Sequence, residues 1–156
     1  MDGTDPELIL DENGVCNHCH SAQESLKQCE KERINLPKWI ERVKKDGQGK
    51  TYDCLIGLSG GVDSSTVLHQ AMKLGLRPLT FSMDNGYNDP RADANIFQMV
   101  EKLKVPLYRY VLDLDKFRDL QSAYLKAGVI NVECSFDHLL WGATLEMASK
   151  YRIKWI

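Results

Sequence analysis

Three features that mark large classes of proteins are missing from this sequence of 156 residues. No stretch approaches the roughly 20 apolar residues that a membrane-spanning helix needs. The first six residues carry two aspartates and no basic residue, so they lack the basic and apolar regions of a signal peptide. Lys and Arg total 20 against 22 Asp and Glu. This balance disfavours a surface devoted to nucleic acid, so we expect a cytoplasmic protein with no membrane and no nucleic-acid partner.

The number of cysteines, five, is odd. An odd number of cysteines without a secretory leader argues against a disulfide framework and for a reducing compartment. In that setting cysteines bind metals, take part in catalysis or are buried. We expect Cys54 to lie in the core and Cys134 to be a small buried residue, with the nucleophile of a sulfur-transfer enzyme as the alternative for Cys134. We expect packing roles for the three tryptophans. The cysteines are Cys16, Cys19, Cys29, Cys54 and Cys134, and the tryptophans are Trp39, Trp141 and Trp155.

The first third of the chain carries few apolar residues in any regular pattern. Residues 1–25 are rich in turn formers, whereas residues 26–50 are mostly charged and predict a helix with Leu36, Ile40 and Val43 on one face. The Gly-rich stretch 46–50 at the end of this segment predicts that the helix stops there and that a flexible joint follows it. We therefore expect two parts, an N-terminal cysteine-bearing segment with its helix and a second domain; they are 1–50 and 51–156.

From residue 51 onward, apolar runs alternate with amphipathic segments. This alternation predicts an α/β fold, a parallel sheet with helices on both faces. The last five residues look like a core strand, and the sequence stops inside it, so we expect the second domain to be incomplete. The expected strands are 52–58, 77–83 and 106–112 with a fourth beginning at 153–156, and the expected helices are 62–74, 91–103, 115–127 and 136–151.

The strongest local signal is the sequence Leu-Ser-Gly-Gly-Val-Asp-Ser-Ser at 58–65, between an expected strand and an expected helix. Glycines let the backbone turn sharply and approach a ligand. The helix that follows offers unpaired amides and the positive end of its dipole, so the turn is a candidate anion site. It is not a Walker A loop, because no Gly-Lys-Ser/Thr follows. The alternative is a tight turn in which Asp63 or Ser64 merely caps the helix.

This sequence resembles the PP-loop, Ser-Gly-Gly-x-Asp-Ser, of the ATP pyrophosphatases. The resemblance implies an adenine-nucleotide alpha-hydrolase-like, Rossmann-like fold and cleavage of ATP between its α and β phosphates. It also implies that Asp63 organises Mg²⁺ and, with Ser59, forms the catalytic pair. The residues implied to cradle the pyrophosphate are Ser59, Gly60, Gly61, Val62, Asp63, Ser64 and Ser65.

The end of the second expected strand is the next candidate. In open α/β sheets ligands bind beyond the carboxyl ends of the strands. Backbone at the strand end is placed to contact adenine, and the two polar residues that follow are placed to contact ribose or metal; an ordinary polar turn is the alternative. The residues of this candidate adenosine site are Phe81, Ser82, Met83, Asp84 and Asn85.

Cys16 and Cys19 form a Cys-x-x-Cys, which is half of a structural zinc site. His18, His20 and Cys29 are the local candidates for the missing ligands, although none supplies a second pair. A redox or sulfur-relay pair and two reduced thiols are the alternatives.

The run from Asp5 to Cys19 resembles the N-terminus of the N-acetyl sugar amidotransferases, PP-loop enzymes of bacterial surface-polysaccharide synthesis. The resemblance continues in Asp-Asn-Gly-Tyr-Asn at 84–88, the segments 117–121 and 124–127, Phe-Asp-His at 136–138 and the run 151–156. It covers essentially the whole chain but only about the first half of a typical member. Members usually carry an upstream Cys-x-x-Cys, of which Met1 and Asp2 look like the tail, so two zinc ligands are missing here.

The resemblance implies an ATP-dependent amidotransferase that turns the N-acetyl group of a nucleotide-linked sugar into an acetamidino group. The sequence shows no glutaminase of its own, so the resemblance implies ammonia from a partner glutaminase with a cyclase-like barrel subunit. Asp137 and His138 are candidates to orient substrate or move a proton; the alternative is Asp137 in a first helical turn. A PP-loop tRNA thiolase and a non-catalytic nucleotide-binding chain are the rival functions.

Overall fold

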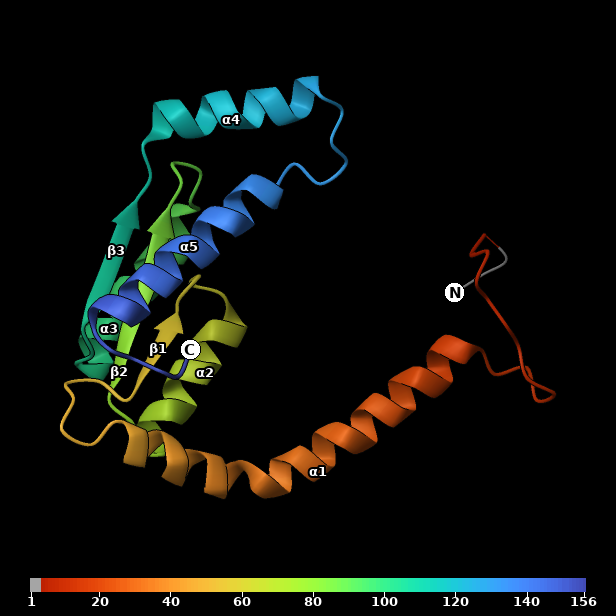
Figure 1. Cartoon of the computed structure of the whole chain (residues 1–156), viewed down its shortest axis with the longest axis horizontal. Helices are drawn as coiled ribbons and strands as arrows, with labels where there is room; N and C mark the ends of the chain where they lie inside the picture. Colours follow the sequence, from red (N-terminus) through yellow and green to blue (C-terminus); the bar gives the residue numbers. More distant parts are fainter. Residues whose placement is uncertain (1–3) are drawn as a thin grey trace. The chain divides into compact units, whose positions relative to one another are not determined.

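The computed structural model describes residues 4–156 (Figure 1). The chain divides into two compact units, Met1–Glu41 and Arg42–Ile156. The expected tail of an upstream cysteine motif, Met1 and Asp2, lies outside the described residues. No helix in the described part of the chain is both long and apolar enough to cross a bilayer.

The N-terminal unit contains a small polar turn and most of helix α1, Asn17–Asp46. Leu10 and Cys16 form an isolated antiparallel bridge, and Asp11 Oδ1 accepts hydrogen bonds from the amides of Asn13 and Val15 at 2.8 and 2.9 Å. The prediction of a turn-rich segment up to residue 25 was wrong, because α1 already begins at Asn17. The reason is that residues 17–25 are almost all exposed, so the helix shows no apolar periodicity that sequence could reveal.

The second unit is built on a three-stranded parallel sheet in the order β1-β2-β3. The strands are β1 Cys54–Gly57, β2 Pro78–Asp84 and β3 Leu107–Val111. Leu55 N donates to Trp155 O at 2.9 Å, and Cys54 forms a parallel bridge with Trp155. The expected fourth strand therefore begins beside β1, on the edge opposite β2.

Helices cover both faces of this sheet, as predicted. Figure 1 shows α5, Cys134–Lys150, across one face, with α2, Val62–Lys73, and α3, Pro90–Leu103, on the other. Helix α4, Leu114–Lys126, lies beyond the carboxyl ends of the strands (Figure 1). These four helices begin and end within two residues of the predicted ones.

The core explains why these residues form these elements. Leu79, Phe81 and Met83 alternate along β2 and pack with Ala143, Met147 and Ala148 of α5, whereas Thr80 and Ser82 alternate with them along the same strand. Near-continuous burial of β2 is typical of a parallel strand covered on both faces. Cys54 is buried as expected, and burial raises the pKa of its thiol to about 11. Cys134, also expected to be buried, is only partly so, because it lies in the first turn of α5.

One buried carboxylate ties the start of the sheet together. Asp53 is 4% exposed and accepts hydrogen bonds from the Arg77 amide at 2.9 Å and from the Arg77 guanidinium. The same guanidinium donates to the carbonyls of Gly47 and Lys50, both at 2.8 Å. This network fixes the segment after α1 against the amino ends of β1 and β2, far from the carboxyl ends where ligands bind.

Candidate functional site

The Gly-rich turn joins the carboxyl end of β1 to the amino end of α2. Leu58 N donates to Phe81 O at 2.7 Å, which extends the sheet pairing into the turn. The N-cap of α2 is Gly61, and no side chain caps it among the described residues. The alternative, a helix capped by the side chain of Asp63 or Ser64, is therefore wrong. The first amides of α2 precede the helical hydrogen-bond ladder, so this helix start remains a candidate anion site.

Gly60 is the position where this turn requires glycine. Its φ is +76°, in the left-handed region that disfavours side chains. A Cβ at Gly60 would overlap the backbone of Ala92, whose carbonyl carbon would lie 2.7 Å away. Asn95 Nδ2 donates to Gly60 O at 3.1 Å. Helix α3 therefore packs directly against the turn and holds its backbone in place.

The serine hydroxyls of the turn bind to one another and to the backbone. Ser64 Oγ lies 3.1 Å from Ser59 Oγ and accepts a hydrogen bond from Ser59 N at 3.2 Å. Ser65 Oγ donates to Gly61 O at 2.7 Å. Asp63 is exposed in the first turn of α2. The hydroxyls preorganise the turn, and the Asp63 carboxylate stays open to a ligand.

The predicted adenosine residues separate into two groups at the end of β2. Phe81, Ser82 and Met83 are buried and line a cavity, whereas Asp84 and Asn85 do not line it. Asn85 Oδ1 accepts a hydrogen bond from the Tyr87 amide at 3.0 Å. For Asn85 this is the ordinary polar turn that was the alternative to a ribose or metal contact. The structure thus brings the first three residues to the cavity and uses the last two in the loop.

Asp84 belongs to a network centred on Arg109 of β3. Arg109 Nη2 lies 2.8 Å from Asp84 Oδ2 and 2.6 Å from Asp93 Oδ2. These bonds hold the pKa of both carboxyl groups below its usual range and raise the pKa of the guanidinium. Asp93 Oδ1 accepts from Asn88 Nδ2 at 3.1 Å. The network links β3 to the loop after β2, and no single sequence motif contains it.

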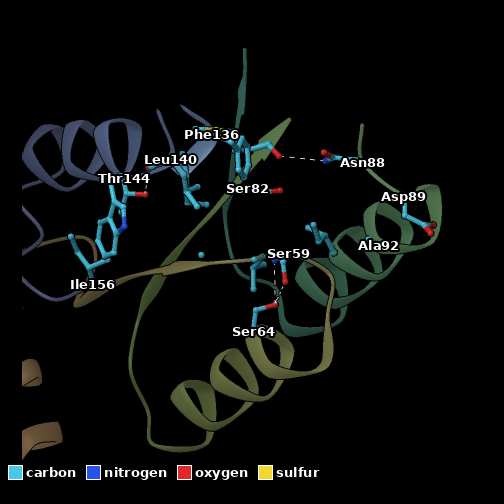
Figure 2. A pocket seen from close by; sticks show the side chains of 16 residues that line it. Ser59, Ser64, Ser82, Asn88, Asp89, Ala92, Phe136, Leu140, Thr144 and Ile156 are labelled. Carbon is cyan, nitrogen blue, oxygen red and sulfur yellow. Dashed lines mark hydrogen bonds between the residues drawn. The ribbon is translucent and has the colours of Figure 1, made fainter. Parts of the chain in front are cut away.

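The cavity has a volume of about 460 Å³, within the range of small-molecule sites. Figure 2 shows Ser59 and Ser64 at one end, Asn88, Asp89 and Ala92 along one side, and Phe136, Leu140 and Thr144 of α5 along the other. Helix α5 was not predicted to contribute these residues, although spacings of four residues repeat along it. The lining also includes Gly57, Leu58, Phe81, Ser82, Met83, Ile96, Trp141 and Ile156.

Trp141 departs from its predicted packing role. Trp141 is 60% exposed and lines the cavity, so it belongs to the cavity wall and not to the core. The sequence of α5 is apolar on several sides, and its pattern therefore does not say which face meets the sheet.

Asp137 and His138 lie exposed in the first turns of α5, and neither is among the cavity residues. Their neighbour Phe136 does line the cavity. Successive residues on a helix point about 100° apart, so the two polar side chains lie on other faces of α5. Their assignment to substrate stays a prediction.

The cysteine pair lies at the start of α1, within the N-terminal unit. Cys16 Sγ lies 3.2 Å from Cys19 Sγ, and this contact lowers the pKa of Cys16 and raises that of Cys19. Both nearby histidines already have carboxylate partners: His18 lies 2.7 Å from Asp5 and His20 lies 2.8 Å from Asp11.

The residues around this pair do not complete a metal site. Within residues 4–156 no group of three or more His, Cys, Asp or Glu is arranged to hold a metal ion. A closed zinc site needs four ligands. The described residues therefore supply a pair of thiols and do not fit a structural zinc ion.

Comparison with known proteins places the fold but not the family. The sequence matches no protein-family model, and no curated protein matches it. NMN synthetase from Francisella tularensis is similar with a TM-score of 0.53 and 17% identity, over 75% of this chain and 51% of that chain. NH₃-dependent NAD synthetase from Campylobacter jejuni, in complex with nitrate, gives a TM-score of 0.54 and 11% identity, over 78% of this chain and 53% of that chain.

The chain therefore spans about half the length of the solved structures that it matches. At these identities the likeness concerns the fold alone. The predicted α/β fold, a parallel Rossmann-like sheet covered by helices, is confirmed as the fold of the NMN and NAD synthetase structures.

Proposed function

We propose that this chain binds MgATP at the turn after β1 and is part of a PP-loop enzyme that cleaves ATP between its α and β phosphates. The observation that carries the proposal is the turn itself, in which Gly60 packs against Ala92 and the amides that open α2 have no side-chain cap. A backbone with free amides and no side chain at the closest approach suits a polyphosphate. The cavity beside it has room for the nucleoside.

The structural likeness supports the same class. NMN and NAD synthetases belong to the PP-loop ATP pyrophosphatase superfamily, and one of the similar structures is of an ammonia-dependent enzyme. An ammonia-using reaction driven by ATP is the activity that the sequence resemblance also implies. The proposal thus rests on the local geometry of the turn, with fold and sequence resemblance in agreement.

The residues present fit a magnesium ion delivered with the nucleotide. Mg²⁺ prefers carboxylate, phosphate and water oxygens. Asp63 is exposed one residue after the start of α2 and engages no partner in the described chain, so its carboxylate is free to share the ion with phosphate oxygens. Bound Mg²⁺ would neutralise charge on the pyrophosphate as it leaves.

We further propose that the acceptor is the acetamido group of a nucleotide-linked N-acetyl sugar. The amide oxygen would attack the α-phosphorus and pyrophosphate would leave. Ammonia would then attack the activated carbon and AMP would leave, which produces an acetamidino group. In this scheme the amides and hydroxyls of 59–65 stabilise the leaving pyrophosphate. Ammonia would come from a partner glutaminase with its cyclase-like barrel subunit.

The test separates the general proposal from the specific one. The chain is incubated with Mg²⁺, ATP labelled at the α-phosphate, ammonium and a UDP-linked N-acetyl sugar, and the products are separated. AMP formed only with the sugar present supports the full proposal. In a second incubation, labelled pyrophosphate and a different amide replace the labelled ATP and the sugar, with unlabelled ATP present. Exchange of the label into ATP under these conditions supports α–β cleavage and rejects the sugar. ADP as the product contradicts the PP-loop proposal.

A control identifies the site responsible. Asp63→Asn removes the carboxylate charge with almost no change in size, whereas Asp119→Asn makes the same change at an exposed position on α4. The AMP signal should fall with the first variant and persist with the second. Equal activity in both variants would place the chemistry elsewhere.

A further inference from the structure

The side chain of Asn88 is held so that only its oxygen is available to a ligand. Asn88 Nδ2 donates to Asp93 Oδ1 at 3.1 Å and to Met83 O at 3.4 Å. Both partners are acceptors, so the nitrogen must face them, and both of its hydrogens are used. In the described chain Asn88 Oδ1 has no hydrogen-bond partner. Asn88 lines the cavity, and Figure 2 shows its amide end pointing toward Phe136.

Arg109 fixes this orientation from the neighbouring strand. Its Nη2 lies 2.6 Å from Asp93 Oδ2, which leaves Asp93 Oδ1 to accept from Asn88. A second bond to Asp84 and the Phe97 ring, 5.6 Å from the guanidinium carbon, hold Arg109 on two more sides. Arg109 is only 20% exposed, so its charge is well shielded from solvent. Rotation of the Asn88 amide would place its oxygen against a carboxylate, which is unfavourable.

The surroundings of Asn88 limit what it can meet. The cavity walls nearest the loop after β2 are mostly apolar, with Met83, Ile96 and Phe136 among them. A planar base has two apolar faces and a polar edge, so it suits such a wall with one polar group. Phosphates carry no hydrogen-bond donor, and the turn after β1 already serves them. Ser82 and Asp89 also line the cavity, but the Asp89 carboxylate already accepts from the Arg91 amide and guanidinium. Asn88 Oδ1 is the acceptor left without a partner in this amide, and the exocyclic amine of a purine is a donor that suits it.

We infer that Asn88 Oδ1 accepts a hydrogen bond from the 6-amino group of adenine, and that Arg109, acting through Asp93, is the positioning residue that makes this cavity selective for adenine nucleotides. The inference rests on the proposed binding of ATP and adds the group that recognises the base. Guanine presents an oxygen at the same position and would face Asn88 Oδ1 acceptor to acceptor, so it should be rejected.

The experiment measures binding of three triphosphates with Mg²⁺ by calorimetry. The ligands are ATP, purine riboside triphosphate, which lacks the amine, and GTP. The unmodified protein should bind ATP about tenfold more tightly than purine riboside triphosphate, the effect of one lost hydrogen bond to a partly buried acceptor. GTP should bind more weakly still. This arm alters only the ligand, so it does not depend on any variant folding.

Variants then locate the effect. Asn88→Leu should bind ATP and purine riboside triphosphate equally, both at the weaker affinity. Gln98→Leu makes the same change at an exposed amide of α3 outside this cavity and should retain the tenfold preference. Arg109→Met should reduce the preference, and Arg109→Lys should restore part of it. A merely structural role for Arg109 would change stability without changing this ratio.

Each other outcome contradicts the inference in its own way. Equal binding of ATP and purine riboside triphosphate by the unmodified protein would overturn it, as would a preference that survives Asn88→Leu. A loss seen only with 2′- or 3′-deoxy ATP would assign Asn88 to the ribose instead of the base. Failure of the unmodified protein to bind any triphosphate would overturn the proposed function itself.

Discussion

The loops that follow β1 and β2 stand side by side at the same edge of the sheet, yet they are held by different forces. The turn after β1 is stabilised by hydroxyls and backbone within a few residues, as in the 2.7 Å bond from Ser65 to Gly61. The loop after β2 is stabilised by charge from β3, through the bonds of Arg109 to Asp84 and Asp93. The hydrogen bonds that hold the first loop are uncharged and mostly local, with one from Asn95 of α3 to Gly60 O, whereas those that hold the second come from a charged residue on another strand.

The two loops would suit the two halves of a nucleotide in different ways. A polyphosphate needs many donors and no obstruction, and a glycine turn before a helix supplies both. A base needs one correctly oriented group, and orientation requires neighbours that hold it. If the proposed function holds, the charged network would serve selectivity for the base, whereas the turn after β1 would serve binding of the phosphates.

The largest effect is expected where the first loop tolerates no side chain. Gly60→Ala should lower the free energy of unfolding by more than about 3 kcal/mol, because positive φ strain adds to overlap with the Ala92 backbone. Gly49→Ala is the matched control, since Gly49 has φ +74° but no atom within 4 Å of the added Cβ. It should lower the free energy of unfolding by about 1 kcal/mol. Urea denaturation measures both, and equal losses would refute close packing of the turn.

The second-largest loss of stability is expected from replacing Arg109, which lies at the centre of the charged network around the loop after β2. Arg109→Met leaves Asp84 and Asp93 without their shared partner and should lower the free energy of unfolding by about 2 kcal/mol. Arg91→Met is the control, because Arg91 pairs with Asp89 while 90% exposed, and such pairs contribute less than about 1 kcal/mol. The same denaturation experiment compares them. A loss for Arg109→Met no greater than for Arg91→Met would show that the network does not hold the loop.

Asp63→Asn should separate stability from ligand binding at the first loop. The side chain is exposed, so the free energy of unfolding should change by less than about 0.5 kcal/mol. Affinity for ATP in the presence of Mg²⁺ should fall about tenfold, whereas affinity in excess EDTA should not change. Calorimetric titration under both conditions tests this. An equal loss with and without Mg²⁺ would mean that Asp63 contacts the nucleotide and not the ion.

Acid should weaken the second loop gradually. Hydrogen bonds from Arg109 lower the pKa of Asp84 and Asp93 below 3.8, so the folded state keeps these carboxylates ionised after unfolded chains have taken up protons. Their contribution to stability is complete above the unfolded pKa and is lost as pH falls from there through the lower folded values. Urea midpoints below pH 4 should therefore fall less steeply in Arg109→Met than in the unmodified protein. Parallel slopes would contradict the assignment.

The parts of the site that sequence could predict are those encoded locally. The turn at 58–65 carries its glycines, hydroxyls and helix start in one stretch, and the structure places them at the end of β1 as expected. The alternation of strands and helices likewise gave the fold and most boundaries. The predicted start of helix α1 was too late, because the first turns of this helix bury no periodic apolar face.

What sequence could not predict depends on distance along the chain. Arg109 lies 16 residues from Asp93 and 25 from Asp84, and nothing in a single sequence pairs them. The cavity wall formed by Phe136, Leu140 and Trp141 was missed because α5 is apolar on several sides. Only packing decides which of those sides meets the sheet and which meets a ligand.

The most direct test of the central claim is an amide NMR spectrum recorded as MgATP is added. If the turn after β1 holds the phosphates, the largest shifts should fall on the amides of Gly60, Gly61, Val62 and Asp63. Amides at Asp53 and Arg77, at the amino ends of β1 and β2, serve as the reference and should not move. Saturable shifts centred on the turn would support the account. No shifts there, or shifts confined to another surface, would contradict it.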